Sequence, residues 1–136
     1  MKLLVDRDIS HADQAFNSFG EVRLFDGRAL SNADLGDAEV LITRSVTRVG
    51  EPLLAGSAIR YVGTTTAGTD HIDQGWLAKH NITVTAAPGC NAHAVAEHVV
   101  CCISAYAAER RLPLSVLSVG VIGYGHVGRA LARLLI

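Results

Sequence analysis

Short apolar runs alternate with amphipathic segments along the first 90 residues of the chain. Apolar runs that end in polar or turn residues are typical of the buried strands of a parallel sheet. The predicted strands are 2–6, 21–25, 39–45, the start of 59–73, and 82–89. The predicted helices between them are 10–20, 31–38, 49–56 and 74–81. This alternation predicts an α/β fold in which helices cover both faces of a parallel sheet.

Cap residues mark the ends of two of these helices. Ser10 is a candidate N-cap for the first helix, and Gly20 is expected to end it. Asp70 and Asp73 are candidate caps for a helix that begins near Ile72.

The segment 90–112 differs from the rest because it is long and apolar on almost all sides. Two neighbouring stripes at helical spacing carry its apolar residues, which are Ala92, Val95, Val99, Cys102 and Tyr106 in one and Ala96, Val100, Ile103 and Ala107 in the other. A helix of this kind is expected to be buried on most faces. We therefore expect it, with Asn91 as its N-cap, to mark a domain boundary and to pack against two domains, or against a domain and a partner subunit.

The last residues, VGVIGYGHVGRALARLLI (119–136), contain the pattern G-x-G-x-x-G at Gly123, Gly125 and Gly128. The apolar run 117–123 predicts a strand before this turn, and the residues after it have helical character. A strand, a glycine-rich turn and a helix in this order predict a dinucleotide-binding turn. The interpretation depends on both neighbours, the strand and the helix. The alternative is a glycine-rich turn that only packs tightly.

Each residue of this turn has a physical task in the dinucleotide interpretation. Gly123 permits the tight turn, Gly125 lets the backbone approach a pyrophosphate, and Gly128 lets strand and helix pack closely. The backbone N–H groups of His126 and Val127 open the helix, where its dipole favours an anion. The acid that binds the ribose hydroxyls is expected about 20 residues beyond the motif. The 136 residues therefore leave the choice between NAD and NADP open.

Polar residues follow three predicted strands at the edge of a parallel sheet where ligands bind. They are Arg44, Ser45 and Thr47, then residues 64–73, then Pro88, Gly89 and Asn91. Together they offer a guanidinium group, hydroxyl groups and backbone N–H groups to an anion. The alternatives are ordinary: a solvated surface charge for Arg44, and structural roles for His71 and His93. No complete catalytic set is present, so the pattern predicts a binding half-site.

Composition narrows the class of protein. The chain has 136 residues, of which 49% are hydrophobic and 18% charged, as in a folded domain. A formal net charge of −1 gives no general attraction to nucleic acid or to an anionic membrane. The three cysteines form no CxxC pair, which indicates reduced thiols and no zinc site. The start, MKLLVDRDIS, has the pattern of neither a signal peptide nor a membrane span, so we expect a cytoplasmic protein.

Four segments, taken together, resemble the D-isomer-specific 2-hydroxyacid dehydrogenases. They are RSVT (44–47), VGTTTAGTDHID (62–73), APGCNAHAVAEHV (87–99) and VGVIGYGHVG (119–128). The resemblance implies a flavodoxin-like substrate domain into which a Rossmann domain is inserted. It places residues 1–90 in the substrate domain, 91–112 in a linking and dimerisation helix, and 113–136 at the start of the Rossmann domain. It also implies NAD as cofactor, a small phosphorylated hydroxy acid as substrate, and a homodimer.

The resemblance assigns roles to individual residues. Ser45 and Thr66 are expected to contact the substrate, with the backbone around Gly68 beside it and Asn91 nearby. We add Arg44 as a partner of the substrate's phosphate, because it lies at the same strand end. The implied cofactor residues are Gly123, Gly125, His126, Val127 and Gly128.

The resemblance also implies catalytic residues that have no counterpart here. The family's chemistry requires an Arg for the carboxylate, a His that takes the hydroxyl proton, and a Glu or Asp paired with that His, all beyond the glycine-rich turn. We therefore expect an N-terminal part of a longer dehydrogenase, without turnover by itself. Two alternatives stay open: another dehydrogenase of the family, such as one that acts on 3-phosphoglycerate, and a non-catalytic binding or dimerisation module.

Overall fold

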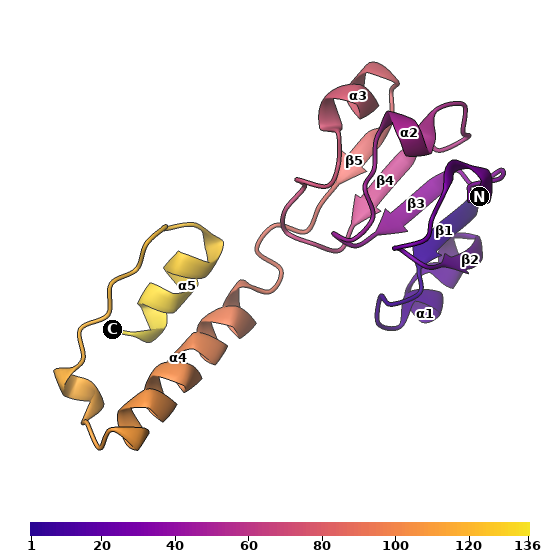
Figure 1. Ribbon diagram of the computed structural model, residues 1–136. Coiled ribbons are helices and arrows are strands. Elements are labelled where there is room, and N and C mark those ends of the chain that lie inside the picture. The colour runs from indigo at the N-terminus through magenta and orange to yellow at the C-terminus, as the bar shows by residue number, and fades with distance from the viewer. The chain divides into compact units, whose positions relative to one another are not determined.

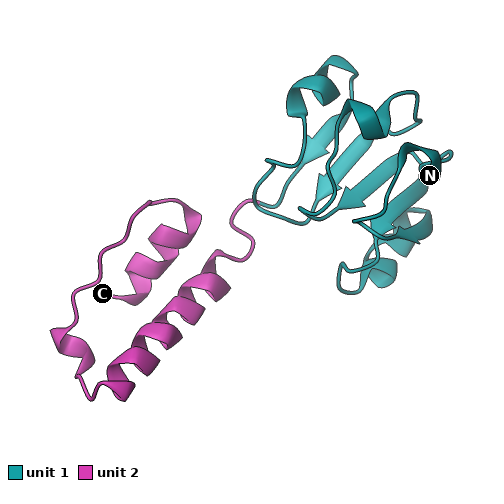
Figure 2. Ribbon diagram, viewed as in Figure 1, with its two compact units in different colours: residues 1–87 teal, residues 88–136 magenta.

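A computed structural model describes residues 1–136, which divide into two compact units, residues 1–87 and 88–136 (Figure 2). The first unit is built on a sheet and the second on helices (Figure 1). Each unit has hydrophobic core residues of its own. None of the helices is both long enough and apolar enough to cross a membrane.

The first unit contains five parallel strands in the order β2-β1-β3-β4-β5. The strands are β1 (Lys2–Asp6), β2 (Glu21–Phe25), β3 (Val40–Thr43), β4 (Tyr61–Thr64) and β5 (Thr83–Thr85). The order is that of flavodoxin-like sheets, in which the chain reverses direction across the sheet between β1 and β3. The predicted α/β class and parallel sheet are confirmed, although β3 and β5 are shorter than the runs that predicted them.

Helices cover both faces of this sheet because its central strands are apolar on both sides. On one face, Leu4, Leu41 and Val62 pack with residues of α2 (Glu51–Leu54) and α3 (Gln74–Lys79). On the other face, Leu3, Val5, Val40 and Ile42 pack with Ala12 of α1 (Ala12–Phe16). Every residue of β3 is buried, which accounts for the continuous apolar run in the sequence.

The start of the first helix differs from its prediction. The N-cap position of α1 is occupied by His11 and not by the predicted Ser10. The backbone of His11 is left-handed (φ 57°), and its side chain makes no capping hydrogen bond. A turn in which the Ala12 N–H donates to the Ile9 carbonyl (3.2 Å) holds Ser10 outside the helix. The helix is also short, and a 3-10 turn at Asn17–Phe19 completes the segment.

Two further helix predictions have different outcomes. The segment 31–38 contains only the 3-10 turn Asn32–Asp34, capped by Ser31, because Gly36 (φ 56°) turns the chain away. The predicted cap at Asp73 is confirmed, since its carboxylate accepts a hydrogen bond from the Trp76 N–H (2.9 Å).

The second unit consists of α4 (Ala92–Glu109), a 3-10 turn at Leu114–Val116, and α5 (His126–Leu134). The predicted long helix is confirmed, and Asn91 occupies its N-cap position without a side-chain hydrogen bond. The two helices pack through a core made mostly of alanine, with Ala92 and Ala96 against Ala130 and Leu131. The expected burial of α4 on most faces is not found within this unit, because α5 covers only one face and leaves residues such as Tyr106 exposed.

The predicted strand at 117–123 is wrong for this structure. The segment has no regular secondary structure, and Val119, Val121 and Ile122 are exposed. A strand exists only through hydrogen bonds to a neighbouring strand, and the second unit contains no strand to supply them. The helix after the glycine-rich turn is present as predicted. Only one of the two neighbours on which the dinucleotide interpretation depends has therefore formed.

Gly128 packs against the turn that precedes its own helix. A Cβ atom at Gly128 would lie 2.2 Å from the Gly123 carbonyl oxygen, whereas one at Gly120 would meet nothing within 4 Å. We expect Gly128→Ala to destabilise the second unit by about 1–3 kcal/mol, because the added methyl group forces the turn and helix apart. Amide hydrogen exchange in α4 and α5 measures the loss. Gly120→Ala is the control, and equal protection in the two variants would contradict this packing role.

Candidate functional site

Five polar residues are buried in the structure, and all belong to the carboxyl ends of strands or to the loops that follow them. They are Asp6, Thr43, Thr47, Thr64 and His71. The alternation of side chains along β1, β3 and β4 puts Asp6, Thr43 and Thr64 on the same face as Leu4, Leu41 and Val62. Buried polar groups are costly unless they are hydrogen-bonded, so this edge of the sheet is the candidate site. Among the buried polar side chains only the Thr43 hydroxyl has no partner.

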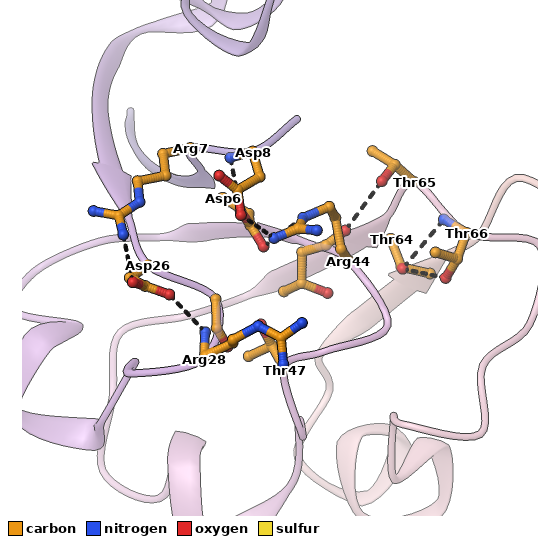
Figure 3. A network of polar contacts seen from close by, with 12 residues as sticks. Asp6, Arg7, Asp8, Asp26, Arg28, Arg44, Thr47, Thr64, Thr65 and Thr66 are labelled. Atoms are coloured by element: carbon orange, nitrogen blue, oxygen red, sulfur yellow. Dashed lines mark hydrogen bonds and ion pairs between the residues drawn. The ribbon is translucent and has the colours of Figure 1, made fainter. Parts of the chain in front are cut away.

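Arg44 follows β3 and is bound to the end of β1 (Figure 3). Its Nε donates to Asp6 Oδ2 at 3.0 Å, and a terminal nitrogen pairs with the Asp8 carboxylate. Asp6 is fully buried, and its second oxygen accepts from the Asp8 N–H at 3.0 Å. The hydrogen bond to Asp6 raises the pKa of Arg44. Arg44 is therefore neither a solvated surface charge nor a free guanidinium, since only its remaining N–H groups can meet a ligand.

Gly27 lets the loop after β2 lie directly on Asp6. A Cβ atom at Gly27 would come within 2.2 Å of Asp6 Oδ2. The Thr47 hydroxyl donates to the Gly27 carbonyl at 2.8 Å in a buried position. Three loops thus converge on one carboxylate. The positions of Asp6 and Gly27 in this site were not predicted from the sequence. The only local signal was an acid at the end of an apolar run.

Thr64, Thr66 and His71 form a second polar group, at the end of β4. The Thr64 hydroxyl lies 2.8 Å from the Thr66 hydroxyl and 3.1 Å from His71 Nε2. The Thr66 hydroxyl donates to the Gly68 carbonyl at 3.1 Å, and the Thr66 carbonyl accepts from the Ala87 N–H at 3.2 Å. Thr66 is therefore held by both the β4 and β5 loops.

The predicted substrate residues of the first unit lie on neighbouring loops. Thr43 and Thr64 are paired in the sheet, so Ser45 and Thr66 each follow the end of one of two adjacent strands. Ser45 and Gly68 are exposed, and Thr66 is half-buried. The structure gives no hydrogen bond to the Ser45 side chain, whose hydroxyl is open to solvent.

A cavity of about 630 Å³ also lies in the first unit, lined by segments 30–32, 48–53 and 70–73. Of the buried polar residues only His71 reaches it. The cavity is lined by three carboxylates, from Glu51, Asp70 and Asp73, and one cation, Arg48. That balance repels an anionic acid. Two carboxylates, Asp6 and Asp8, also face Arg44 at the strand ends, so the choice of that edge rests on its buried polar groups and not on its charge.

The predicted cofactor residues form one turn in the second unit. Gly123 is left-handed (φ 92°), Gly125 is the N-cap of α5, and His126 is its first residue. No acidic residue lies in the first turn of α5, and a Cβ atom at Gly123 or Gly125 would meet nothing within 4 Å. Open backbone at a helix N-terminus without a nearby carboxylate suits an anion. The strand predicted before this turn is absent, so the helix N-terminus and the open glycine backbone are the features that support an anion site here.

Residues 3–128 match the catalytic domain of the D-isomer-specific 2-hydroxyacid dehydrogenases, so the chain belongs to this family. Within it, the chain is 48% identical over 136 residues to erythronate-4-phosphate dehydrogenase of Marinobacter nauticus and 47% identical over 135 residues to that of Enterobacter sp.. These alignments cover 99% of the chain but 35% and 36% of the relatives. The chain thus spans about a third of the length of the curated relatives that it matches.

Solved structures with low sequence identity share the fold. The D-lactate dehydrogenase from Aquifex aeolicus complexed with NAD and lactic acid has a TM-score of 0.78 at 21% identity, covering 99% of this chain and 48% of that one. The NAD-bound 3-phosphoglycerate dehydrogenase of Entamoeba histolytica has a TM-score of 0.72 at 20% identity, covering 99% and 50%.

Protonation of His71 makes the free energy of unfolding depend on pH. Burial lowers the pKa of His71, as does the charge of Arg48, while Asp70 opposes both. The folded chain therefore takes up a proton on His71 only at a lower pH than the unfolded chain, which does so near the ordinary pKa of 6.5. Because the unfolded state then binds more protons, we expect the free energy of unfolding to fall as the pH drops below about 6.5. Denaturant titrations at several pH values measure this loss. His71→Gln should reduce it, and an unchanged pH dependence in that variant would show that other groups cause it.

Proposed function

We propose that this chain belongs to an enzyme that oxidises the 2-hydroxyl group of 4-phospho-D-erythronate with NAD, in the biosynthesis of vitamin B6. The observation that carries the proposal is 47–49% identity along 98–99% of the chain to relatives named erythronate-4-phosphate dehydrogenase. We further propose that the protein acts in the cytoplasm as a homodimer.

The proposal divides the chain by task. Residues 1–90 bind the substrate, residues 91–112 link the domains and contribute to the dimer, and residues 113–136 begin the NAD-binding domain. The two compact units, divided after residue 87, support this arrangement. The confirmed helix Ala92–Glu109 falls within the linking segment.

The loops after β3 and β4 would bind the substrate. The exposed Ser45 hydroxyl and the held Thr66 hydroxyl would contact it beside the backbone of Gly68. Arg44 would meet its phosphate with the N–H groups that Asp6 and Asp8 leave free. Asn91, which is exposed at the start of α4, is a further proposed contact.

The glycine-rich turn would hold the pyrophosphate of NAD. The residues fit this group, since Gly123 and Gly125 leave open space and α5 begins without an acidic residue. The N–H groups of His126 and Val127 would donate to it, and Gly128 would keep the helix close to the turn. Bound NAD would supply the acceptor for the hydride that leaves C2 of the substrate.

A substrate panel tests the proposed activity. NADH formation by the purified full-length enzyme to which this chain belongs is followed with 4-phospho-D-erythronate, 3-phosphoglycerate and D-lactate. The 136 residues by themselves are expected to turn over none of the three. We expect kcat/KM for 4-phospho-D-erythronate to exceed the others by at least about tenfold, or roughly 1.4 kcal/mol of transition-state binding. Preference for 3-phosphoglycerate would identify a different dehydrogenase of the family, and absence of turnover with all three would favour the non-catalytic module.

A substitution in the glycine-rich turn separates binding from folding. A Cβ atom at Gly125 would meet no atom within 4 Å, so Gly125→Val should leave the helices intact while its side chain blocks the approach of a pyrophosphate. We expect NAD affinity to fall at least about tenfold, with unchanged affinity for the phosphorylated acid. Calorimetry measures both, and circular dichroism checks the fold. Gly120→Ala, also in open space, is the control. Full NAD affinity in Gly125→Val would overturn the assignment of this turn.

A further inference from the structure

Three side chains and one carbonyl group at the end of β4 form a continuous hydrogen-bonded series. His71 Nε2 lies 3.1 Å from the Thr64 hydroxyl, which lies 2.8 Å from the Thr66 hydroxyl, which lies 3.1 Å from the Gly68 carbonyl oxygen. Thr64 and His71 are only 5% and 7% exposed, respectively, so water has little access to replace their mutual hydrogen bond.

Only one arrangement of protons satisfies all three hydrogen bonds. The Gly68 carbonyl can only accept, so the single hydroxyl proton of Thr66 is donated to it. Thr66 must then accept from the hydroxyl of Thr64, whose single proton is used there. Thr64 must in turn accept from His71, which requires a proton on Nε2. The series therefore runs in one direction, from the imidazole to the backbone carbonyl.

This order decides what the Thr66 hydroxyl offers to a ligand. Its proton is engaged with Gly68, and one of its two lone pairs receives the Thr64 proton. The remaining lone pair belongs to a half-buried side chain that still has access to solvent. Toward a ligand, Thr66 is thus an acceptor.

We propose that His71, acting through Thr64, makes the Thr66 hydroxyl an acceptor that recognises a hydroxyl group of the substrate in preference to its carboxylate or phosphate. His71 is a positioning residue in this inference, which rests on the proposed function for the identity of the substrate. A carboxylate or phosphate oxygen has no proton to donate, so it binds Thr66 only by displacing the hydrogen bond to Gly68. The anionic groups of the substrate are left to donors such as the free N–H groups of Arg44.

The backbone around Thr66 supports this arrangement. The Thr66 N–H donates weakly to the Thr64 hydroxyl oxygen at 3.4 Å, and the Ala87 N–H fixes the Thr66 carbonyl at 3.2 Å. Burial and Arg48 also favour neutral His71, for which a proton on Nε2 leaves Nδ1 without one.

Nitrogen NMR of the His71 imidazole tests the proton order without any ligand. We expect the Nε2–H tautomer in the unmodified protein and in Thr64→Ser, which keeps the hydroxyl. Thr64→Val removes the acceptor and should shift the tautomer equilibrium. A predominant Nδ1–H tautomer in the unmodified protein would overturn the inference, whether or not the proposed function holds.

Binding of substrate analogues tests the consequence for recognition. Calorimetry compares 4-phospho-D-erythronate with its 2-deoxy and 3-deoxy analogues. We expect loss of one hydroxyl group to weaken binding about tenfold, as for one unmade hydrogen bond. The ratio of the dissociation constants of the deoxy analogue and of 4-phospho-D-erythronate should approach one in Thr66→Val and in His71→Leu. His71→Gln, whose amide nitrogen can replace Nε2 as a donor, should retain most of it.

The outcomes distinguish this inference from the proposed function. Full discrimination in a folded His71→Leu variant, or equal binding of all three ligands to the unmodified protein, would overturn the role of His71. If 4-phospho-D-erythronate does not bind, the proposed function fails. The same variants are then compared with 3-phosphoglycerate and 3-phosphooxypropionate, which differ in one hydroxyl group, and the ratio is subject to the same criteria.

Discussion

A carboxylate with no exposure to solvent organises the candidate site at the carboxyl edge of the sheet. Asp6 ends β1, and removing its charge from water is unfavourable unless donors surround it. Arg44 and the Asp8 N–H supply those donors, while Gly27 allows the neighbouring loop to approach. The positions of the loops after β1, β2 and β3 therefore depend on one another. The ion pair with Asp6 holds Arg44 at the site.

Hydroxyl groups continue the hydrogen-bonded network at the ends of the next two strands, β4 and β5. Thr64 and Thr66 connect the end of β4 to His71, and Ala87 ties Thr66 to the loop after β5. These hydrogen bonds fix the side chains of the candidate site without a ligand, and preorganisation of this kind reduces the entropy lost when a ligand binds. The candidate site thus has the Arg44 guanidinium, paired with Asp6 and Asp8, near the end of β3 and a series of hydrogen-bonded hydroxyl groups at the end of β4.

The shape of the glycine-rich turn depends on the absence of Cβ atoms at its glycines, which allows other groups to pack closely against their backbone. Gly128 accommodates the Gly123 carbonyl, and Gly89 accommodates the ring of His126, whose Nδ1 would lie 2.8 Å from a Cβ atom there. These contacts shape the turn without a strand before it. The family assignment rests on the match over residues 3–128 and holds although 117–123 forms no strand.

Local patterns determined the class of fold. The apolar runs and the helices between them were sufficient to predict a parallel sheet covered on both faces, because a central strand that is buried on both sides must be apolar along its whole length. Cap prediction was less reliable: Asp73 caps its helix, whereas Ser10 is excluded by a turn that depends on neighbouring backbone. Predicted residues such as Ser45 and Thr66 were brought to adjacent loops by the strand order, which their spacing alone does not specify.

The sequence by itself determined the five strands, the long helix Ala92–Glu109 and the glycine spacing of the turn, since each depends on residues close together in the chain. Only the tertiary structure decided that Arg44 is paired with Asp6, that the Thr64 hydroxyl is hydrogen-bonded to His71, and that 117–123 stays unpaired. A hydrogen bond or an ion pair needs two partners at a set distance. Partners such as Asp6 and Arg44, 38 positions apart, meet only once the sheet is assembled.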